Sequence, residues 1–121
     1  MICLLNKGGF EMSFDMPRCK ITVVKRTINQ DLIDEYLDDT HKDIGPCERF
    51  RDGQEFVIDP SVMPEDFCAC CAWAWADIRG DILTVALGGD MPGMKQRGTV
   101  ITGCRDWFRP VIFKVERVEN D

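Results

Sequence analysis

The segment from Pro64 to Leu87 has helical periodicity, whereas the chain on both sides of it has the alternating pattern of β-strands. Small and apolar side chains recur at the helical period at Cys68, Cys71, Trp75, Ile78 and Ile82. Gly88-Gly89 is typical of a helix end, and Gly80-Asp81 predicts a kink or a division into two helices. A chain with one long apolar helix among short strands is restricted to folds in which helices cover a sheet.

Two tryptophans in this segment point in different directions. Trp73 and Trp75 are two residues apart and therefore lie about 160° from one another around a helix axis. A helix with indoles on nearly opposite sides needs a cover on both sides. We expect this helix to be central to the domain or to form part of a subunit interface. Trp107, between the last two predicted strands, is expected either to be exposed for partner binding or to fold back onto the sheet.

The remaining pattern predicts four strands and one short helix. The strands are expected at residues 18–28, 54–59, 98–104 and 110–118, and the helix at residues 30–38 with Asn29 as its N-cap. Leu32, Ile33, Tyr36 and Leu37 would form one apolar stripe on that helix. The connection from Arg105 to Arg109 is short enough for an antiparallel hairpin. The order β-α-β-α(α)-β-β predicts a single α+β domain with a mainly antiparallel sheet and helices packed on one face.

The composition is that of a folded globular protein and argues against a protein that binds nucleic acid or membranes. The chain has 121 residues, 45% hydrophobic and 30% charged, which is ordinary for a folded globular domain. Its formal net charge is −6, whereas a protein that binds nucleic acid or anionic membranes usually has a basic surface. No stretch reaches the roughly 18 apolar residues of a membrane helix, and no export signal is present. We therefore expect a soluble cytoplasmic protein with neither nucleic acid nor a membrane as a partner.

The first residues have the pattern of a mis-assigned translation start. Lys7-Gly8-Gly9 can be encoded by a purine-rich ribosome-binding sequence, and Met12 follows at a spacing suited to initiation, with Met16 as the alternative start. Residues 1–11 are accordingly expected to be a mis-assigned start or a disordered tail, and residues 12–121 the single α+β domain. A peptide of the native protein containing Cys3 would refute the mis-assigned start.

Seven cysteines are the most unusual feature of the composition. In a reducing compartment they are expected to be thiols or metal ligands and not disulfides. Cys19 lies in a predicted strand and is expected to be a small buried hydrophobic residue. Cys68 and Cys71 share a helix face, whereas Cys70 points elsewhere. Their C-x-x-C spacing follows two prolines, which is a weak context for a thioredoxin-like motif.

Three cysteines are each expected at the end of an element: Cys47 before a strand, Cys68 at a helix start and Cys104 after a strand. Such ends can meet at one pole of an α+β domain, and Cys71 would complete a set of four thiolates. Thiolates of this kind favour zinc, copper(I) or an iron–sulfur cluster. The alternative is that these residues are buried or incidental thiols without a ligand role.

No pattern of catalytic residues is found. The one histidine, His41, excludes mechanisms that need two imidazoles. Asp77 and Asp81 are expected to cap a helix, to pair with Arg79 or Arg109, or to be acids with a shifted pKa. Gly88-Gly89-Asp90 follows a predicted helix, so it indicates a helix cap and not a phosphate-binding loop. We predict no catalytic residue, and the sequence favours a non-enzymatic protein over an enzyme.

Five motifs together resemble a known family. They are CKITVVKR, GPCERFRDGQEFVID, FCACCAWAWADI, LGGDMP and GTVITGCRDWFRPVIFKVERV. The chain resembles, over about Arg18 to Val118, a family of short uncharacterised proteins of bacteria and archaea. The resemblance implies a small cytosolic domain with recurrent cysteines near Cys47, Cys68 and Cys104, and no established activity, cofactor or substrate.

Three hypotheses on function follow. The first is a thiolate-based metal or iron–sulfur binding module that uses Cys47, Cys68, Cys71 and Cys104. The second is an interaction protein that homodimerises or docks a partner through its tryptophan-rich helix, with Trp73, Trp75 and Trp107 as the binding residues. The third is a thiol-redox protein, which would need an accessible thiol of low pKa between Cys68 and Cys71.

Overall fold

The computed structural model describes residues 16–118, so the predicted tail over residues 1–11 lies outside the described residues. The elements are β1 (Arg18–Arg26), α2 (Gln30–Tyr36), β2 (Glu55–Ile58), α3 (Glu65–Cys70), α4 (Ala72–Ala86), β3 (Thr99–Gly103) and β4 (Val111–Val118). The predicted order of strands and helices is confirmed. No helix of the described part is long and apolar enough to cross a membrane.

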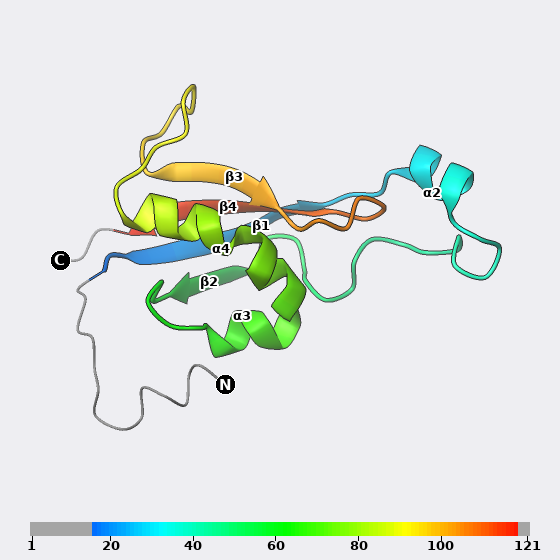
Figure 1. Ribbon diagram of the computed structural model, residues 1–121, viewed down its shortest axis with the longest axis horizontal. Helices are drawn as coiled ribbons and strands as arrows, with labels where there is room; N and C mark the ends of the chain where they lie inside the picture. Colours follow the sequence, from blue (N-terminus) through cyan, green and yellow to red (C-terminus); the bar gives the residue numbers. More distant parts are fainter. Residues whose placement is uncertain (1–15, 119–121) are drawn as a thin grey trace.

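The four strands form one antiparallel sheet in the order β2-β1-β4-β3 (Figure 1). Ile21 of β1 lies opposite Phe56 of β2 on one side and Val115 of β4 on the other. Val115 in turn lies opposite Val100 of β3, so the predicted hairpin of β3 and β4 is confirmed. This row of four apolar residues is one line of the hydrophobic face of the sheet.

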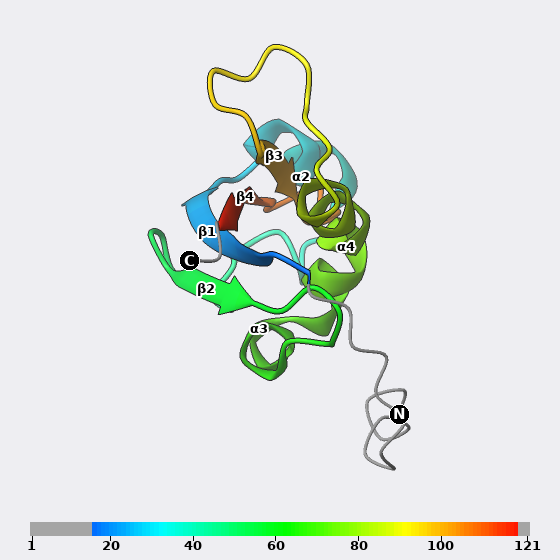
Figure 2. The ribbon, with the colours of Figure 1, turned by 90° about the vertical axis from the view of Figure 1, so that its left-hand side faces the viewer.

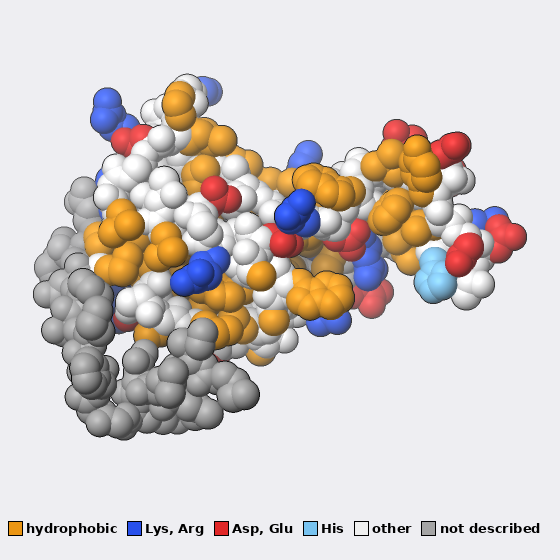
Figure 3. Space-filling model, in the orientation of Figure 1, with side chains coloured by type: hydrophobic (Ala, Val, Ile, Leu, Met, Phe, Trp, Pro, Cys, Tyr) orange, Lys and Arg blue, Asp and Glu red, His pale blue; other side chains and the backbone are white. Residues whose placement is uncertain are grey.

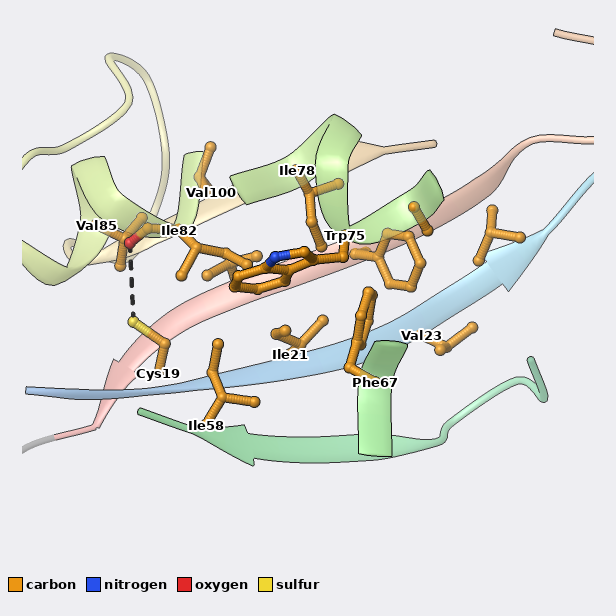
Figure 4. Packing of buried hydrophobic residues seen from close by; sticks show 14 of the residues in the cluster. Cys19, Ile21, Val23, Ile58, Phe67, Trp75, Ile78, Ile82, Val85 and Val100 are labelled. Atoms are coloured by element: carbon orange, nitrogen blue, oxygen red, sulfur yellow. Dashed lines mark hydrogen bonds between the residues drawn. The ribbon is translucent and has the colours of Figure 1, made fainter. Parts of the chain in front are cut away.

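α3 and α4 cover this face of the sheet (Figure 2). α4 buries Trp75, Ile78 and Ile82 against β1 and β4, as Figure 4 shows. The α+β fold with helices on one face is therefore confirmed. Five aromatic rings fill the part of the core near α3, with Phe67 at their centre.

The predicted division of the long helix at Gly80-Asp81 is wrong. Gly80 lies inside α4, and the chain instead leaves helical geometry at Cys71, where φ is −162° and ψ is 108°. Cys71 Sγ accepts a hydrogen bond from the backbone N–H of Ala74 at 3.4 Å, which caps the new helix. Ile78 and Ile82 are fully buried on either side of Gly80, so packing on the sheet keeps the helix continuous there.

α2 lies away from the body of the sheet, beside the connection between β3 and β4 (Figure 1). Of its predicted apolar stripe, Ile33 is fully buried, whereas Tyr36 is 71% exposed. Asn29 is at the N-cap position but makes no side-chain cap. Its amide instead donates a hydrogen bond to the carbonyl of Trp107 at 2.6 Å, which ties α2 to the connection.

Candidate functional site

Trp73 is the most exposed large apolar side chain of the described residues. It is 84% exposed, whereas Trp75, two residues further along α4, is 5% exposed. The sheet covers the Trp75 side of the helix, and no described residue covers the Trp73 side. The expectation that both indoles are covered is therefore met for Trp75 alone.

A second exposed indole, Trp107, lies on the connection that contacts the same part of α4. Asp77 Oδ2 accepts a hydrogen bond from the backbone N–H of Arg105 at 2.8 Å. Trp73 lies one turn before Asp77 on α4, and Trp107, which is 61% exposed, follows Arg105 by two residues. We call Trp73, Asp77, Arg105, Asp106 and Trp107 the two-tryptophan surface. Figure 3 shows apolar side chains among charged ones over this part of the molecule.

The backbone around Trp107 is held in place by its neighbours. Asp106 Oδ1 accepts hydrogen bonds from the backbone N–H groups of Phe108 and Arg109 at 3.1 and 3.3 Å. The Arg109 guanidinium lies 3.5 Å from Asp106 Oδ2. This role of Asp106 was not predicted from the sequence, although an aspartate at the start of a short connection is typical of such a turn. Trp107 is therefore presented to solvent by an ordered turn.

Two acidic residues of α4 connect the helix to the β3 edge of the sheet. Asp77 accepts the Arg105 N–H, and Asp81 Oδ2 accepts a hydrogen bond from the Thr102 hydroxyl at 2.6 Å. The predicted pairing with Arg79 or Arg109 is wrong, because the sheet lies within reach of both carboxylates. These acids are structural connectors that hold α4 against β3 and the following residues.

His41 lies outside the two-tryptophan surface. Its Nδ1 is 2.6 Å from Asp38 Oδ1 on the exposed loop after α2. The hydrogen bond from the His41 side chain is the main cause that lowers the pKa of Asp38. Both side chains are largely exposed, which is typical of a surface pair.

Five of the six described cysteines lie half-buried against the hydrophobic core: Cys47, Cys68, Cys70, Cys71 and Cys104. Hydrogen bonds place several of them at the end of the sheet where α3 meets α4. Arg49 donates to the Cys70 carbonyl at 3.4 Å, and Gln54 Nε2 lies 3.9 Å from Cys70 Sγ. We call these five residues the cysteine-rich end.

Cys47 and Cys104 each form a hydrogen bond with one member of the same residue pair of the sheet. Arg26 of β1 lies opposite Val111 of β4. The Arg26 guanidinium donates to the Cys47 carbonyl at 2.8 Å, and the Val111 N–H donates to Cys104 Sγ at 3.3 Å. The Cys47 carbonyl and the Cys104 sulfur therefore each contact one member of this pair.

The cysteine-rich end is not assembled as a metal centre. Among residues 16–118, no three cysteine, histidine, aspartate or glutamate side chains are grouped so that they could hold a metal ion. The sulfur atoms of Cys71 and Cys104 each accept a separate backbone N–H. The predicted four-thiolate shell of Cys47, Cys68, Cys71 and Cys104 is therefore not formed by the side chains as they stand.

Cys19 behaves as the sequence predicts. It is fully buried in β1, and its sulfur atom lies 4.0 Å from the Ile82 carbonyl (Figure 4). Burial raises the pKa of the Cys19 thiol to about 11, against a smaller opposing effect of Arg117. Cys19 is therefore a protonated core residue at neutral pH.

Comparison with known proteins finds no matching family model, no matching curated protein and no matching solved structure. The family resemblance carried by the sequence motifs stays a prediction. Function must therefore be inferred from the geometry of the two-tryptophan surface and the cysteine-rich end.

Proposed function

We propose that the protein is a non-enzymatic interaction module that forms a homodimer through the two-tryptophan surface. The supporting observation is the 84% exposure of Trp73 on a helix that is fixed to the sheet by its opposite side. Tryptophan is among the residues that most often dominate binding energy at protein interfaces. An indole has only two rotatable side-chain bonds and here stands on a fixed helix, so it loses little conformational entropy on binding.

The charges of the surface favour a second copy of the chain as the occupant. Asp77 and Asp106 contribute negative charge, and Arg105 contributes positive charge a short distance away. A surface with both signs can be complementary to itself, because a two-fold axis places each patch against its own copy. A strongly acidic or strongly basic partner is less suited to this surface, because the surface carries charges of both signs.

The apolar area is sufficient for a dimer of moderate affinity. Burying roughly 200 Å² of one indole is worth about 5 kcal/mol before the costs of association are subtracted. A two-fold interface contains two copies each of Trp73 and Trp107, so four indoles are buried in the dimer. After a cost of association of about 4–15 kcal/mol, the four indoles together are compatible with a dissociation constant in the micromolar range.

Native mass spectrometry and light scattering of the full chain and its variants test the proposal. We expect a dimer that Trp73→Ala weakens by at least about a hundredfold and that Trp107→Ala also weakens. Tyr36→Ala is the matched control, because Tyr36 is a 71% exposed aromatic residue on α2 and outside the surface. A monomeric native chain at about 100 μM, or a dimer that neither tryptophan variant weakens, would overturn the proposal.

Soft-metal binding at the cysteine-rich end is a second candidate function. It is supported by the proximity of Cys47 and Cys104 to one residue pair and by the N–H groups that point at two sulfur atoms. Hydrogen bonds to sulfur stabilise ligating thiolates and tune the metal that they hold. The side chains would have to rotate toward one another on binding, since no metal-binding group is formed in the described part.

Elemental analysis of protein purified without oxygen or a metal-affinity tag tests this second candidate. We expect stoichiometric zinc, copper or iron that is lost in Cys47→Ser and in Cys104→Ser. Cys19→Ala is the control, because Cys19 is buried in the sheet away from that end. Metal-free protein with reduced thiols would contradict metal binding and leave the dimer proposal unaffected.

A further inference from the structure

An open groove of about 980 Å³ runs along β2, at the opposite edge of the sheet from β3. β2 and the residues up to Asp66 form one wall, and Trp75, Ala76 and Arg79 of α4 form the other. Val57, Val62 and Met63 give it an apolar lining, and they are 58%, 48% and 42% exposed. The groove shares no residue with the two-tryptophan surface, so it concerns a separate interaction.

The outer edge of β2 has no neighbouring strand in the sheet that residues 16–118 form. β2 is an edge strand, with β1 as its neighbour in the sheet formed by the described residues. Val23 N–H donates to the Gln54 carbonyl, which fixes Thr22 opposite Glu55 as a pair without mutual hydrogen bonds. By the same alternation, the N–H and C=O groups of Val57 point away from β1 and into the open edge.

The charged side chains of the groove are mostly acidic. Glu55, Asp59, Glu65 and Asp66 line it, against the single guanidinium of Arg79. Lys20 lies 3.2 Å from Glu55, and Asp59 accepts hydrogen bonds from Ser61. The side-chain carboxylates of Glu65 and Asp66 at the start of α3 have no hydrogen-bond or ion-pair partner among residues 16–118. Two carboxylates beside an apolar strand edge are therefore available to a cationic ligand.

We propose that this groove binds an extended segment of a partner protein, with alternating basic and apolar residues, as a fifth strand beside β2. The backbone groups of Val57 would pair with the added strand. Its apolar side chains would contact Val62 and Met63, and its lysine or arginine side chains would face Glu65 and Asp66. Backbone pairing supplies affinity in this mode. The carboxylates of Glu65 and Asp66, which we call the acidic wall, supply selectivity for a basic sequence.

Proline substitution can remove an outward N–H of an edge strand without removing a hydrogen bond of the sheet. Val57→Pro removes a donor that points away from β1, so the ladder between β1 and β2 keeps its hydrogen bonds. Ile101→Pro is the matched control on the opposite edge strand. Arg117 N–H donates to the Gly98 carbonyl, and by the same alternation Ile101 also points its N–H outward. Circular dichroism checks that both variants fold.

The probe is a short fluorescein-labelled peptide of alternating lysine and valine, measured by fluorescence anisotropy with the full chain. We expect it to bind the native chain and the Ile101→Pro variant equally, and Val57→Pro at least about tenfold more weakly. A peptide of alternating glutamate and valine should not bind. Absence of lysine–valine binding, or equal binding to Val57→Pro, would overturn the proposal.

Two further measurements test the charge selectivity of the groove and the alternative that a second copy of the chain occupies it. The double variant Glu65→Gln with Asp66→Asn should weaken the lysine–valine peptide several-fold and reduce the salt dependence of binding. Unchanged affinity would overturn the charge selectivity. If the native chain fails to bind the peptide and Val57→Pro instead lowers its oligomeric mass, a second copy occupies the edge and the peptide proposal is wrong.

Discussion

Replacing Phe67 by alanine is predicted to be among the most destabilising single changes in this protein. The ring is fully buried, and its centroid lies 5.0 Å from that of Phe56, 5.3 Å from Phe50, 5.5 Å from Phe113 and 6.2 Å from Trp75. These neighbours come from two strands, a loop and α4, so they cannot all move inward to fill the space. The cost should therefore lie at the upper end of the usual range, at about 4–5 kcal/mol.

Urea denaturation followed by tryptophan fluorescence measures this cost, because Trp75 contacts the Phe67 ring. We expect a lower midpoint with an unchanged denaturant slope and a fall in Tm of roughly 15–20 °C. Tyr36→Ala, which removes an aromatic ring that is 71% exposed, should change the free energy of unfolding by less than about 0.5 kcal/mol. A loss below about 1.5 kcal/mol for Phe67→Ala would refute the inference that these rings form a rigid cluster.

Three further predictions concern single interactions. Because burial raises the pKa of Cys19 from 9.0 to about 11, the unfolded chain loses this proton first, so the free energy of unfolding should fall between those pH values. Urea melts across this range should show a smaller fall for Cys19→Ala. Asp81→Ala and Thr102→Val should show a coupling energy of about 1–2 kcal/mol in a double-mutant cycle, and simple additivity would contradict their 2.6 Å hydrogen bond. Gly89→Ala should lower Tm by several degrees in calorimetry, because its Cβ would lie 2.6 Å from Thr84 Cγ2 and 2.8 Å from the Thr84 carbonyl. An unchanged Tm would show that the backbone there can move.

The strands could be predicted closely from the sequence, because their pattern is local. The predicted strand at residues 98–104 is observed as Thr99–Gly103, and the one at residues 110–118 as Val111–Val118. Alternation of apolar side chains sets each strand, and glycine or proline sets its ends. The burial of Cys19 was also predictable, since the residue lies among β-branched neighbours on the inner face of β1.

The features that depend on distant contacts could not be predicted in the same way. Gly80 has the local pattern of a helix break, but burial of Ile78 against the sheet overrides it, and the sulfur cap of Cys71 moves the break upstream. Tyr36 has the spacing of a buried residue, but α2 lies beyond the body of the sheet. The sequence pattern placed Cys47 before β2 and Cys104 directly after β3. Whether their sulfur atoms meet depends on side-chain rotation, which no sequence pattern specifies.

The sulfur cap of Cys71 has a consequence for how samples are prepared. Alkylation or oxidation of that sulfur adds a substituent to the atom that accepts the Ala74 N–H, which crowds this hydrogen bond and places added bulk two residues before Trp73. A reagent used to block thiols during purification would therefore loosen the helical turn that holds the most exposed indole. Binding measured on alkylated protein would describe a chemically altered surface, so fresh reducing conditions are needed before any association constant is compared between preparations.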